Sequence, residues 1–406
     1  ERGDNPRHLI ANTYVKRGEI LDRNNLTLAE TLGDIGSFNR SYPYPSLSNS
    51  IGYIDQKYGL FGLEKAYDDY LSGLKGYPAS SIWLNYLLYD QPPIGRAIRL
   101  TLDLKLQQKV DDLLQNDQGA AVVLDASNGN ILAIATQPFF DANELEENWA
   151  AWNSSENAPF LNRASQGAYP VGGLLSPLFL LEQDLDSISF FQDPQIFGNE
   201  EFDIQCISQF SNLDTDEQSA IKNGCLSAAS QLIAKINLAD IFESSVFEPI
   251  YNPLANGLPT NLPIAMSKFQ DLHDLISGDN QIRISPLQIA ASLAPLSNGG
   301  IMVYPSLVSS VNVSSGQWVL TPVQEGSPVT TPEKAKEVAE FLASDLIPGW
   351  EISAVTYDLD NAFSWYVMGT HDEWNKTPII IALVLETENR NHAQTIGREI
   401  FKAINQ

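Results

Sequence analysis

The sequence predicts an α+β fold, because strand patterns and helix patterns alternate along the chain. Two apolar runs, at residues 120–124 and 131–135, flank a polar turn at 125–130, which is typical of a β-hairpin. Residues 100–114 carry apolar side chains at a helical spacing after a brief strand. Near the end of the chain, TPIIIALVLETE predicts a buried strand and AQTIGREIFKAI an amphipathic closing helix.

The composition is that of a globular protein with a large acidic excess. The chain has 406 residues, 43% of them hydrophobic, and is therefore long enough to bury a sizeable core. Its 50 acidic residues exceed its 24 basic ones and give a net charge of −26, which repels phosphate backbones and anionic lipid headgroups. We therefore expect no nucleic-acid partner.

The sequence contains neither a membrane span nor a metal-binding pattern. No apolar run approaches the roughly 20 residues that cross a bilayer, and the first ten residues are too polar for a signal peptide. If the protein is membrane-anchored, we expect the anchor to lie upstream of residue 1. The four histidines and two cysteines form no His-x-x-x-His or Cys-x-x-Cys arrangement, so we expect no metal and no cofactor.

The two cysteines, Cys206 and Cys225, leave two alternatives open. They are separated by 18 residues, and a disulfide between them would stabilise the protein by on the order of 3 kcal/mol. The other alternative is a pair of separate buried thiols.

In the N-terminal part, residues 17–30, RGEILDRNNLTLAE, predict two short strands around a polar turn. Asn25 in that turn tolerates a left-handed conformation. Residues 61–71 carry apolar side chains at a helical spacing, and Gly73 is placed to end the helix. Further on, Pro286 suits the first turn of a helix that Gly299 and the next glycine end.

One stretch in the middle of the chain, NRASQGAYPVGGLLSP at 162–177, carries a resemblance to a known family. Penicillin-binding transpeptidases have a similar run, in which NRA and a Gly-x-Tyr-Pro-Pro-Gly turn precede Ser-x-x-Lys-Pro. The family's serine is acylated and its lysine activates that serine. Here Gly173 stands at the serine position and Ser176 at the lysine position. The matching residues are Tyr169, Pro170, Gly172 and Pro177.

The resemblance extends from Arg17 to the C-terminus. Residues 17–29 resemble the segment with which class B penicillin-binding proteins leave the membrane. Residues 100–114 resemble the segment that opens their transpeptidase domain, and residues 119–143 resemble the hairpin that follows it. About eighty residues separate the first segment from that domain, as in the short-pedestal branch of class B. Glu64 follows the family pattern, the alternative being an exposed helical carboxylate.

The family's second motif, Ser-x-Asn, relays protons and binds the substrate amide. Its counterpart here is Gly224, Cys225 and Leu226, which lacks both the hydroxyl and the carboxamide. The third motif, Lys-Thr-Gly-Thr, should precede a Trp-Phe-x-Gly landmark, which Trp365 and the residues after it supply. Counting back places four residues at that motif: Trp350, Glu351, Ile352 and Ser353. We expect this change to replace a cation that attracts carboxylates by a tryptophan beside a carboxylate that repels them.

The resemblance implies a penicillin-binding transpeptidase fold, similar to that of β-lactamases, with an antiparallel sheet flanked by helices. It implies a small β-rich pedestal at 1–97 and a transpeptidase-like domain at 98–406. Because all three active-site motifs are degenerate, it also implies a pseudoenzyme outside the cytoplasmic membrane. Such a protein would scaffold or regulate peptidoglycan synthesis or cell division. Its partners would be proteins of those processes, with peptidoglycan a further candidate.

Two other functions remain open in the sequence. The cleft could have been reused to bind or process another ligand, for which the candidate polar side chains are Ser176, Asn223, Glu351 and Ser353. An active transpeptidase with an unorthodox nucleophile ranks last. Ser-x-x-Lys spacing occurs twice elsewhere, at Ser72 with Lys75 and at Ser219 with Lys222, and chance explains both.

Overall fold

The structure is a computed structural model. It describes residues 15–75, 80, 94–183, 185, 217–234, 236, 244–252, 255, 257–261, 263–264, 273–276, 281–313, 316–358, 361–371 and 374–405. No helix among these residues is long and apolar enough to cross a bilayer.

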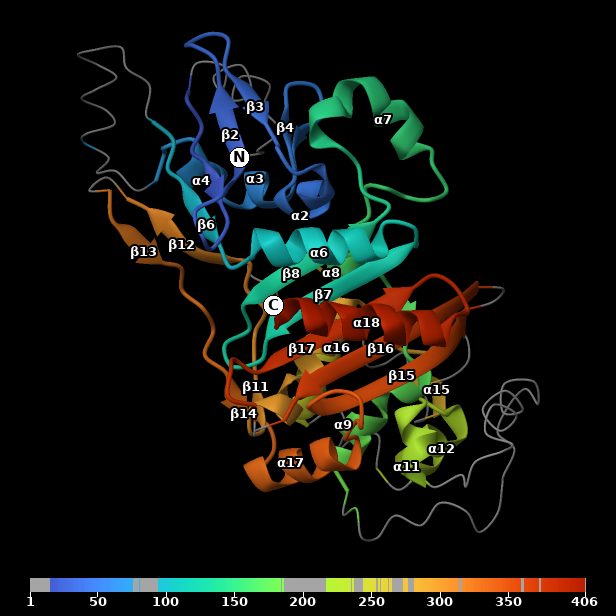
Figure 1. Ribbon diagram of the computed structural model, residues 1–406. Helices are drawn as coiled ribbons and strands as arrows, with labels where there is room; N and C mark the ends of the chain where they lie inside the picture. Colours follow the sequence, from blue (N-terminus) through green and yellow to red (C-terminus); the bar gives the residue numbers. More distant parts are fainter. Residues whose placement is uncertain are drawn as a thin grey trace.

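A five-stranded antiparallel sheet forms the centre of the molecule (Figure 1). Its strand order is β15-β16-β17-β7-β8, so β15 is an edge strand. This confirms the predicted fold class and the predicted hairpin. The strands are β7 (Gly119–Asp125), β8 (Ile131–Gln137), β15 (Gly349–Asp358), β16 (Asn361–Thr370) and β17 (Ile379–Leu385).

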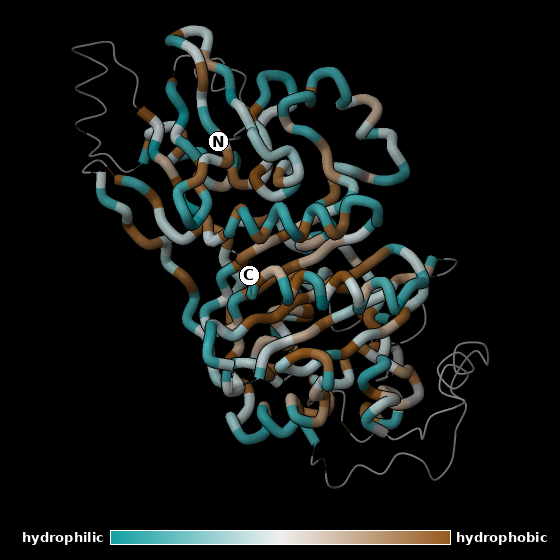
Figure 2. The backbone as a smooth tube through the Cα atoms, viewed as in Figure 1, coloured by the Kyte–Doolittle hydropathy of each residue, from teal (hydrophilic) through white to brown (hydrophobic). Residues whose placement is uncertain are grey.

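Helices cover both faces of this sheet and make three layers. α6 (Leu104–Leu114) and α18 (Arg390–Ile404) lie on one face, and α8 (Arg163–Gln166) and α16 (Pro286–Leu293) lie on the other. Every residue of β17 is buried, as expected for a central strand covered on both faces. Figure 2 shows the hydrophobic colour concentrated along these strands, between helices that are hydrophilic on the outside.

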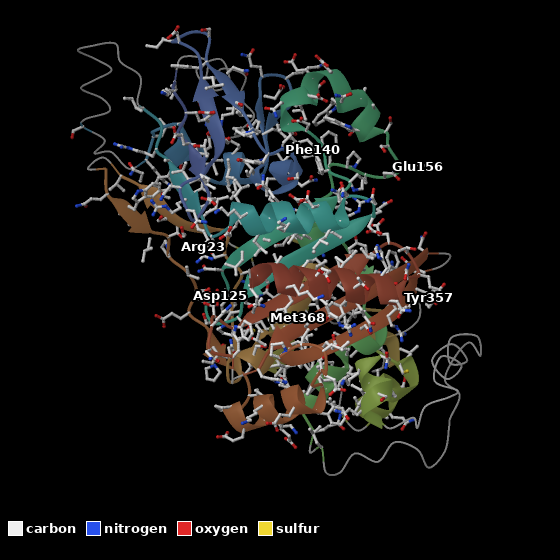
Figure 3. The ribbon with its side chains drawn as sticks, in the orientation of Figure 1. Arg23, Asp125, Phe140, Glu156, Tyr357 and Met368 are labelled. Atoms are coloured by element: carbon white, nitrogen blue, oxygen red, sulfur yellow. The ribbon has the colours of Figure 1, made fainter. Side chains whose placement is uncertain are left out.

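Strand β16 shows how one strand serves two cores. Tyr366 and Met368 belong to the core under α6 and α18, while Trp365 and Val367 belong to the larger core on the opposite face. Met368, labelled in Figure 3, lies in the sheet next to α18. This alternation has the period of two that a pleated strand requires.

A second, six-stranded sheet forms the pedestal, with the order β13-β12-β6-β1-β2-β3. Three of its strands follow residue 97, so the sheet takes strands from both sides of the predicted boundary between 1–97 and 98–406. Asn25, in the turn between the first two strands, has a φ of +67°. The strands are β1 (Ile20–Leu21), β2 (Thr27–Leu32), β3 (Asn39–Ser41), β6 (Ile98–Leu100), β12 (Val308–Asn312) and β13 (Trp318–Leu320).

The remaining elements are short and surround the two sheets. They are η1 (Pro45–Leu47), α2 (Ser48–Ile51), β4 (Ile54–Asp55), β5 (Gly59–Leu60), α3 (Gly62–Ala66), α4 (Asp68–Leu71), η2 (Ala142–Glu144), α7 (Leu145–Asn153), β9 (Tyr169–Pro170), η3 (Gly172–Leu175), α9 (Ser176–Leu181), α11 (Glu217–Lys222), α12 (Leu226–Ile233), η5 (Ser245–Phe247), α14 (Glu248–Tyr251), α15 (His273–Ile276), β10 (Arg283–Ile284), η7 (Ala294–Ser297), β11 (Ile301–Met302), β14 (Ser327–Pro328) and α17 (Pro332–Phe341).

The helix predicted at residues 61–71 is two short helices, α3 and α4. The break falls at Tyr67, whose φ of −114° and ψ of 21° leave the helical region. Leu63 and Leu71 are nevertheless both buried, so the apolar spacing identified the core-facing side correctly.

Glu64 in α3 lies at the centre of a buried ionic cluster in the pedestal. Its carboxylate accepts from Arg17 Nε at 2.6 Å and from Arg40 Nε at 2.7 Å. Burial alone would raise the pKa of Glu64, but the two guanidinium groups outweigh burial and hold that pKa below its ordinary value. The alternative of an exposed helical carboxylate is wrong, because Glu64 is 0% exposed.

Asp111 connects α6, which covers the central sheet, to η1 in the N-terminal part of the chain. Its carboxylate accepts from Ser46 Oγ at 2.6 Å and from Gln107 Nε2 at 2.9 Å. Burial raises the pKa of Asp111 to about 6, so the folded protein holds a proton there that the unfolded chain releases at lower pH.

We expect the Asp111→Asn variant to remove part of the pH dependence of stability. Because the folded pKa lies above the ordinary one, stability falls as pH rises from about 4 to 7, by about 2 kcal/mol. Urea unfolding at pH 4.5 and pH 7 measures this difference in the wild type and in the variant. Asp112→Asn on the exposed side of the same helix is the matched control. Equal pH dependence in the wild type and Asp111→Asn would show that Asp111 does not titrate in this range.

Candidate functional site

The predicted active-site stretch runs along the edge of the central sheet. α8 begins after Asn162, whose Oδ1 accepts from the Ser165 backbone N–H at 3.2 Å. The carbonyl of Pro170 then accepts from Trp365 Nε1 at 2.8 Å and from Thr356 Oγ1 at 2.9 Å. These bonds hold the Tyr-Pro turn against β15 and β16, and the chain continues into η3 and the fully buried α9.

Gly173, at the predicted nucleophile position, is packed directly against the backbone of another degenerate motif. A Cβ atom at Gly173 would lie 2.2 Å from the carbonyl oxygen of Gly224. Gly224 has a φ of +61°, and a Cβ there would lie 2.5 Å from the Cβ of Ala354 on β15. Only glycine fits at both positions, because no side chain can share that space. The backbone around Gly224 thus occupies the volume beside Gly173.

Ser176, at the predicted lysine position, is buried in the first turn of α9. Its Oγ donates to the carbonyl oxygen of Gly173 at 2.7 Å. Phe179 lies three residues further along the same helix and cannot accept a proton. The hydroxyl of Ser176 therefore completes the local helix turn and has no base beside it.

The segment from α11 to α12 covers the outer edge of β15. Lys222 Nζ donates to the carbonyl oxygen of Ala343, and Asn223 Oδ1 accepts from Arg390 of α18 at 3.3 Å. Leu226 begins α12 and packs partly buried against the main core. The predicted second motif thus holds the edge of the sheet with a leucine, a glycine and a buried cysteine.

Our electrostatic expectation for Trp350 and Glu351 is wrong. Trp350 is buried, and its Nε1 donates to Ser297 of η7 at 3.0 Å. Glu351 points to the opposite face of β15, where Arg398 of α18 donates to its carboxylate at 2.9 and 3.1 Å. Burial would raise the pKa of Glu351, but hydrogen bonds, first from Arg398, keep it below its ordinary value. Its charge is therefore neutralised, and it does not face Gly173.

The other residues of the predicted third motif divide between the two faces in the same way. Ile352 is buried on the face that Ala354 shares. Ser353 Oγ accepts from Gln394 of α18 at 3.0 Å, on the face of Glu351. The polar side chains that reuse of the cleft requires therefore do not converge: Ser176 bonds within its own turn, while Asn223, Glu351 and Ser353 are each held by α18.

The lysines of the other two Ser-x-x-Lys spacings bond to groups other than those serines. Lys75 Nζ pairs with Asp69 at 3.2 Å, and Ser72 Oγ donates to the carbonyl oxygen of Asp68. Lys222 bonds to a carbonyl oxygen after α17, as described above. Both spacings stay explained by chance.

Cys225 is buried and is not a free thiol. Its predicted partner, Cys206, lies outside the described residues, so the bridge stays a prediction. Among the residues that the structure describes, no group of three His, Cys, Asp or Glu side chains could hold a metal ion.

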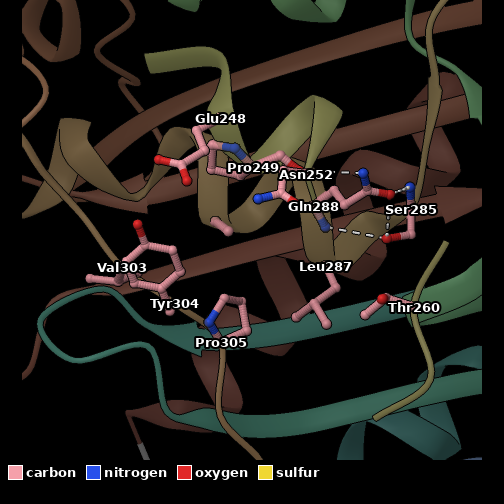
Figure 4. A pocket seen from close by; sticks show the side chains of 11 residues that line it. Glu248, Pro249, Asn252, Thr260, Ser285, Leu287, Gln288, Val303, Tyr304 and Pro305 are labelled. Carbon is pink, nitrogen blue, oxygen red and sulfur yellow. Dashed lines mark hydrogen bonds between the residues drawn. The ribbon is translucent and has the colours of Figure 1, made fainter. Parts of the chain in front are cut away.

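A small cavity lies between α14, α16 and residues 303–305 (Figure 4). Gln288 of α16 reaches into this region, where its Oε1 accepts from the Ser285 backbone N–H at 3.0 Å. Its Nε2 donates to the carbonyl oxygen of Ile250 at 3.0 Å. The cavity has about 20 Å³, which suffices for a single water molecule and for no substrate.

Comparison with known proteins gives partial sequence similarity and nearly complete structural similarity. No family model matches the chain. Peptidoglycan D,D-transpeptidase MrdA of Escherichia coli is 31% identical over 175 residues, 35% of this chain and 28% of that protein. Penicillin-binding protein 3 of Bacillus subtilis is 24% identical over 279 residues, 64% of this chain and 42% of that protein. The aligned part is thus less than half the length of either relative.

Solved structures match almost the whole chain. PBPA from Mycobacterium tuberculosis superposes with a TM-score of 0.76 at 21% identity, over 96% of this chain and 100% of that chain. Pseudomonas aeruginosa PBP2 gives 0.75 at 20% identity, over 96% and 95%. The chain has the fold of the penicillin-binding transpeptidases. Within this family fold, Gly173, Gly224 and Ala354 meet where η3, the start of α12 and β15 converge.

Sequence reasoning missed two features of this site. The contact between Gly173 and Gly224 joins positions 51 residues apart, and two glycines in two degenerate motifs were the available signal. The pairing of Glu351 with Arg398 had a signal too, because a strand residue flanked by two buried apolar neighbours points away from their face.

Proposed function

We propose that this protein is a catalytically inactive member of the penicillin-binding protein family. Its role would be to scaffold or regulate peptidoglycan synthesis or cell division on the extracytoplasmic face of the membrane. The observation that carries the proposal is the packing of Gly173 against Gly224, because it removes both the nucleophile and the space a substrate acyl group needs.

Two further observations support inactivity. Ser176, the hydroxyl nearest to Gly173 along the chain, donates to the carbonyl oxygen of Gly173, and within the described part of the chain no lysine bonds to it. Glu351 and Ser353 bond to α18 on the other face of β15 and are therefore directed away from Gly173. The relative penicillin-binding protein A of M. tuberculosis forms an acyl-enzyme complex with penicillin G. We propose that this chain does not.

The preserved scaffold supports a role through surfaces. The pedestal keeps a buried ionic cluster, and both cores are filled by apolar side chains. A chain that had lost all function would not need an ordered pedestal sheet tied to a second domain. We therefore assign the role to protein contacts with cell-wall synthesis or division proteins.

Deleting the gene in its host tests the proposal. We expect altered cell shape or septation, restored fully both by the wild type and by Ser176→Ala, which removes one hydroxyl and about 1 kcal/mol of hydrogen bonding. No change in shape or septation on deletion would contradict the scaffold role. Failure of Ser176→Ala to restore them, at normal protein level, would show that the hydroxyl acts chemically.

A further inference from the structure

A cleft of about 270 Å³ opens in the pedestal among β3, β4 and α7, which lie together in the upper part of Figure 1. Its lining comes from segments as far apart as Arg17 and Glu146. The volume is close to the lower end of ordinary ligand sites, about 300 Å³. We call this feature the pedestal cleft, and it is separate from the region around Gly173.

Arg40 of β3 lines the pedestal cleft and has bonding capacity left over. Its Nε donates to Glu64 at 2.7 Å, and its Nη1 donates to the carbonyl oxygen of Gly18 at 2.8 Å and to Thr31 at 3.1 Å. Its Nη2 is buried and has no hydrogen-bond partner in the described part of the chain. Less than 1 Å² of this nitrogen is accessible, so Arg40 forms a wall of the cleft and a ligand would meet the exposed polar groups beside it.

The accessible lining of the pedestal cleft combines carboxylates with amides. Asp55 is held in place because its Oδ1 accepts the backbone N–H groups of Lys57 and Tyr58 at 2.7 and 2.8 Å. Glu146 on α7 and Gln56 beside Asp55 are exposed, and neither side chain has a hydrogen-bond partner among the described residues. These groups offer acceptors and donors together.

Apolar side chains complete the lining. Phe38 and Ile54 both line the cleft and are half-buried there. Ring carbons of a ligand would lose water contact against them, while its oxygen atoms would meet the carboxylates and the amides. A lining of this kind fits a ligand that is apolar on its faces and hydroxylated at its edges.

We propose that the pedestal cleft binds one ring of a neutral sugar, and specifically an N-acetylhexosamine unit of a glycan strand. Sugar hydroxyls donate to Asp55 and Glu146, and ring or acetamido oxygens accept from Gln56. A free anion is disfavoured because both carboxylates and the net charge of −26 repel it. The choice of a cell-wall amino sugar rests on the proposed function, whereas the neutral polyol chemistry rests on the cleft alone.

Titration calorimetry of the full chain with the trimer of N-acetylglucosamine tests this site. Glu146→Gln and Gln56→Ala change exposed side chains that the fold does not use, and we expect each to raise the Kd about tenfold. Glu147→Gln, the next residue on α7, does not line the cleft and is the matched control with unchanged Kd.

Two results would overturn the proposal. One is the absence of binding to the wild type at about 10 mM trimer, a concentration well above a Kd of about 1 mM. The other is binding that neither variant weakens, which would place the sugar elsewhere. A third outcome is that a lysine-rich peptide binds, that both variants weaken this binding, and that the trimer does not bind. That outcome would assign the cleft to a basic protein segment instead. None of these results bears on acylation by penicillin, so failure here is distinct from failure of the proposed pseudoenzyme.

Discussion

Replacing Gly173 by serine is expected to lower the free energy of unfolding by about 3 kcal/mol or more, because overpacking a core against backbone is costly. The new Cβ would lie 2.2 Å from the carbonyl oxygen of Gly224 and 3.1 Å from that of Cys225. A flexible side chain could move aside, but these are main-chain atoms at the start of α12. Restoring the family's serine therefore displaces the segment that fills the site.

Urea unfolding of Gly173→Ser measures this loss. Ala168→Ser adds the same hydroxyl to an exposed position five residues earlier, and we expect it to change stability by no more than about 0.5 kcal/mol. We also expect Gly173→Ser to form no adduct with penicillin, since Ser176 offers no base to its hydroxyl. A variant as stable as the wild type would mean that Gly224 is not held against Gly173. A labelled variant would mean that our account of the base is wrong.

Replacing Glu64 by glutamine should have the largest effect in the pedestal, a loss of about 3–5 kcal/mol. The carboxylate is buried between Arg17 and Arg40, with side-chain exposures of 0%, 4% and 5%. An amide can accept from one of the two arginines but carries no charge, so two buried guanidinium groups would be left with insufficient compensation. Asp68 still pairs with Arg17 at 2.6 Å, which keeps the loss from being larger.

Thermal or urea unfolding of Glu64→Gln tests this, with Glu340→Gln as the matched control. Glu340 pairs with Lys336 at 3.7 Å on the exposed side of α17, and such surface pairs contribute about 0–1 kcal/mol. Equal effects of the two substitutions would show that the pedestal cluster is not important for stability.

The fold could be predicted because its signals are local. Pro286 begins α16 within a capping box made by Ser285 and Gln288, and Asn25 adopts the left-handed conformation its turn requires. Alternating and continuous apolar runs marked the hairpin of β7 and β8 and the buried β17. These features depend on neighbours in sequence, so one sequence suffices to identify them.

The site could be predicted only in part, because its geometry depends on contacts between distant segments. The sequence located Gly173 and Ser176 but did not indicate that Gly224 and Ala354 would close on them. Likewise, placing Trp350 beside Glu351 suggested one electrostatic surface, although strand pleating sends the two side chains to opposite faces. No local sequence pattern specifies which helix residues an edge strand contacts.

The pedestal illustrates a similar limit. Arg17 and Glu64 were recognised as parts of two separate patterns, and their meeting with Arg40 required the structure. The pedestal cleft brings together β3, β4 and α7, three elements that sequence analysis had no reason to connect.

The most direct test of the central claim is intact mass measurement of the purified wild-type protein after incubation with a fluorescent penicillin. Acylation requires an activated hydroxyl and a donor-lined site for the oxyanion. Gly173 supplies no hydroxyl, and the backbone of Gly224 fills the adjacent space. We predict an unchanged mass and no fluorescent band. Stoichiometric addition of the penicillin mass, on any residue of this stretch, would contradict the assignment of this protein as a pseudoenzyme.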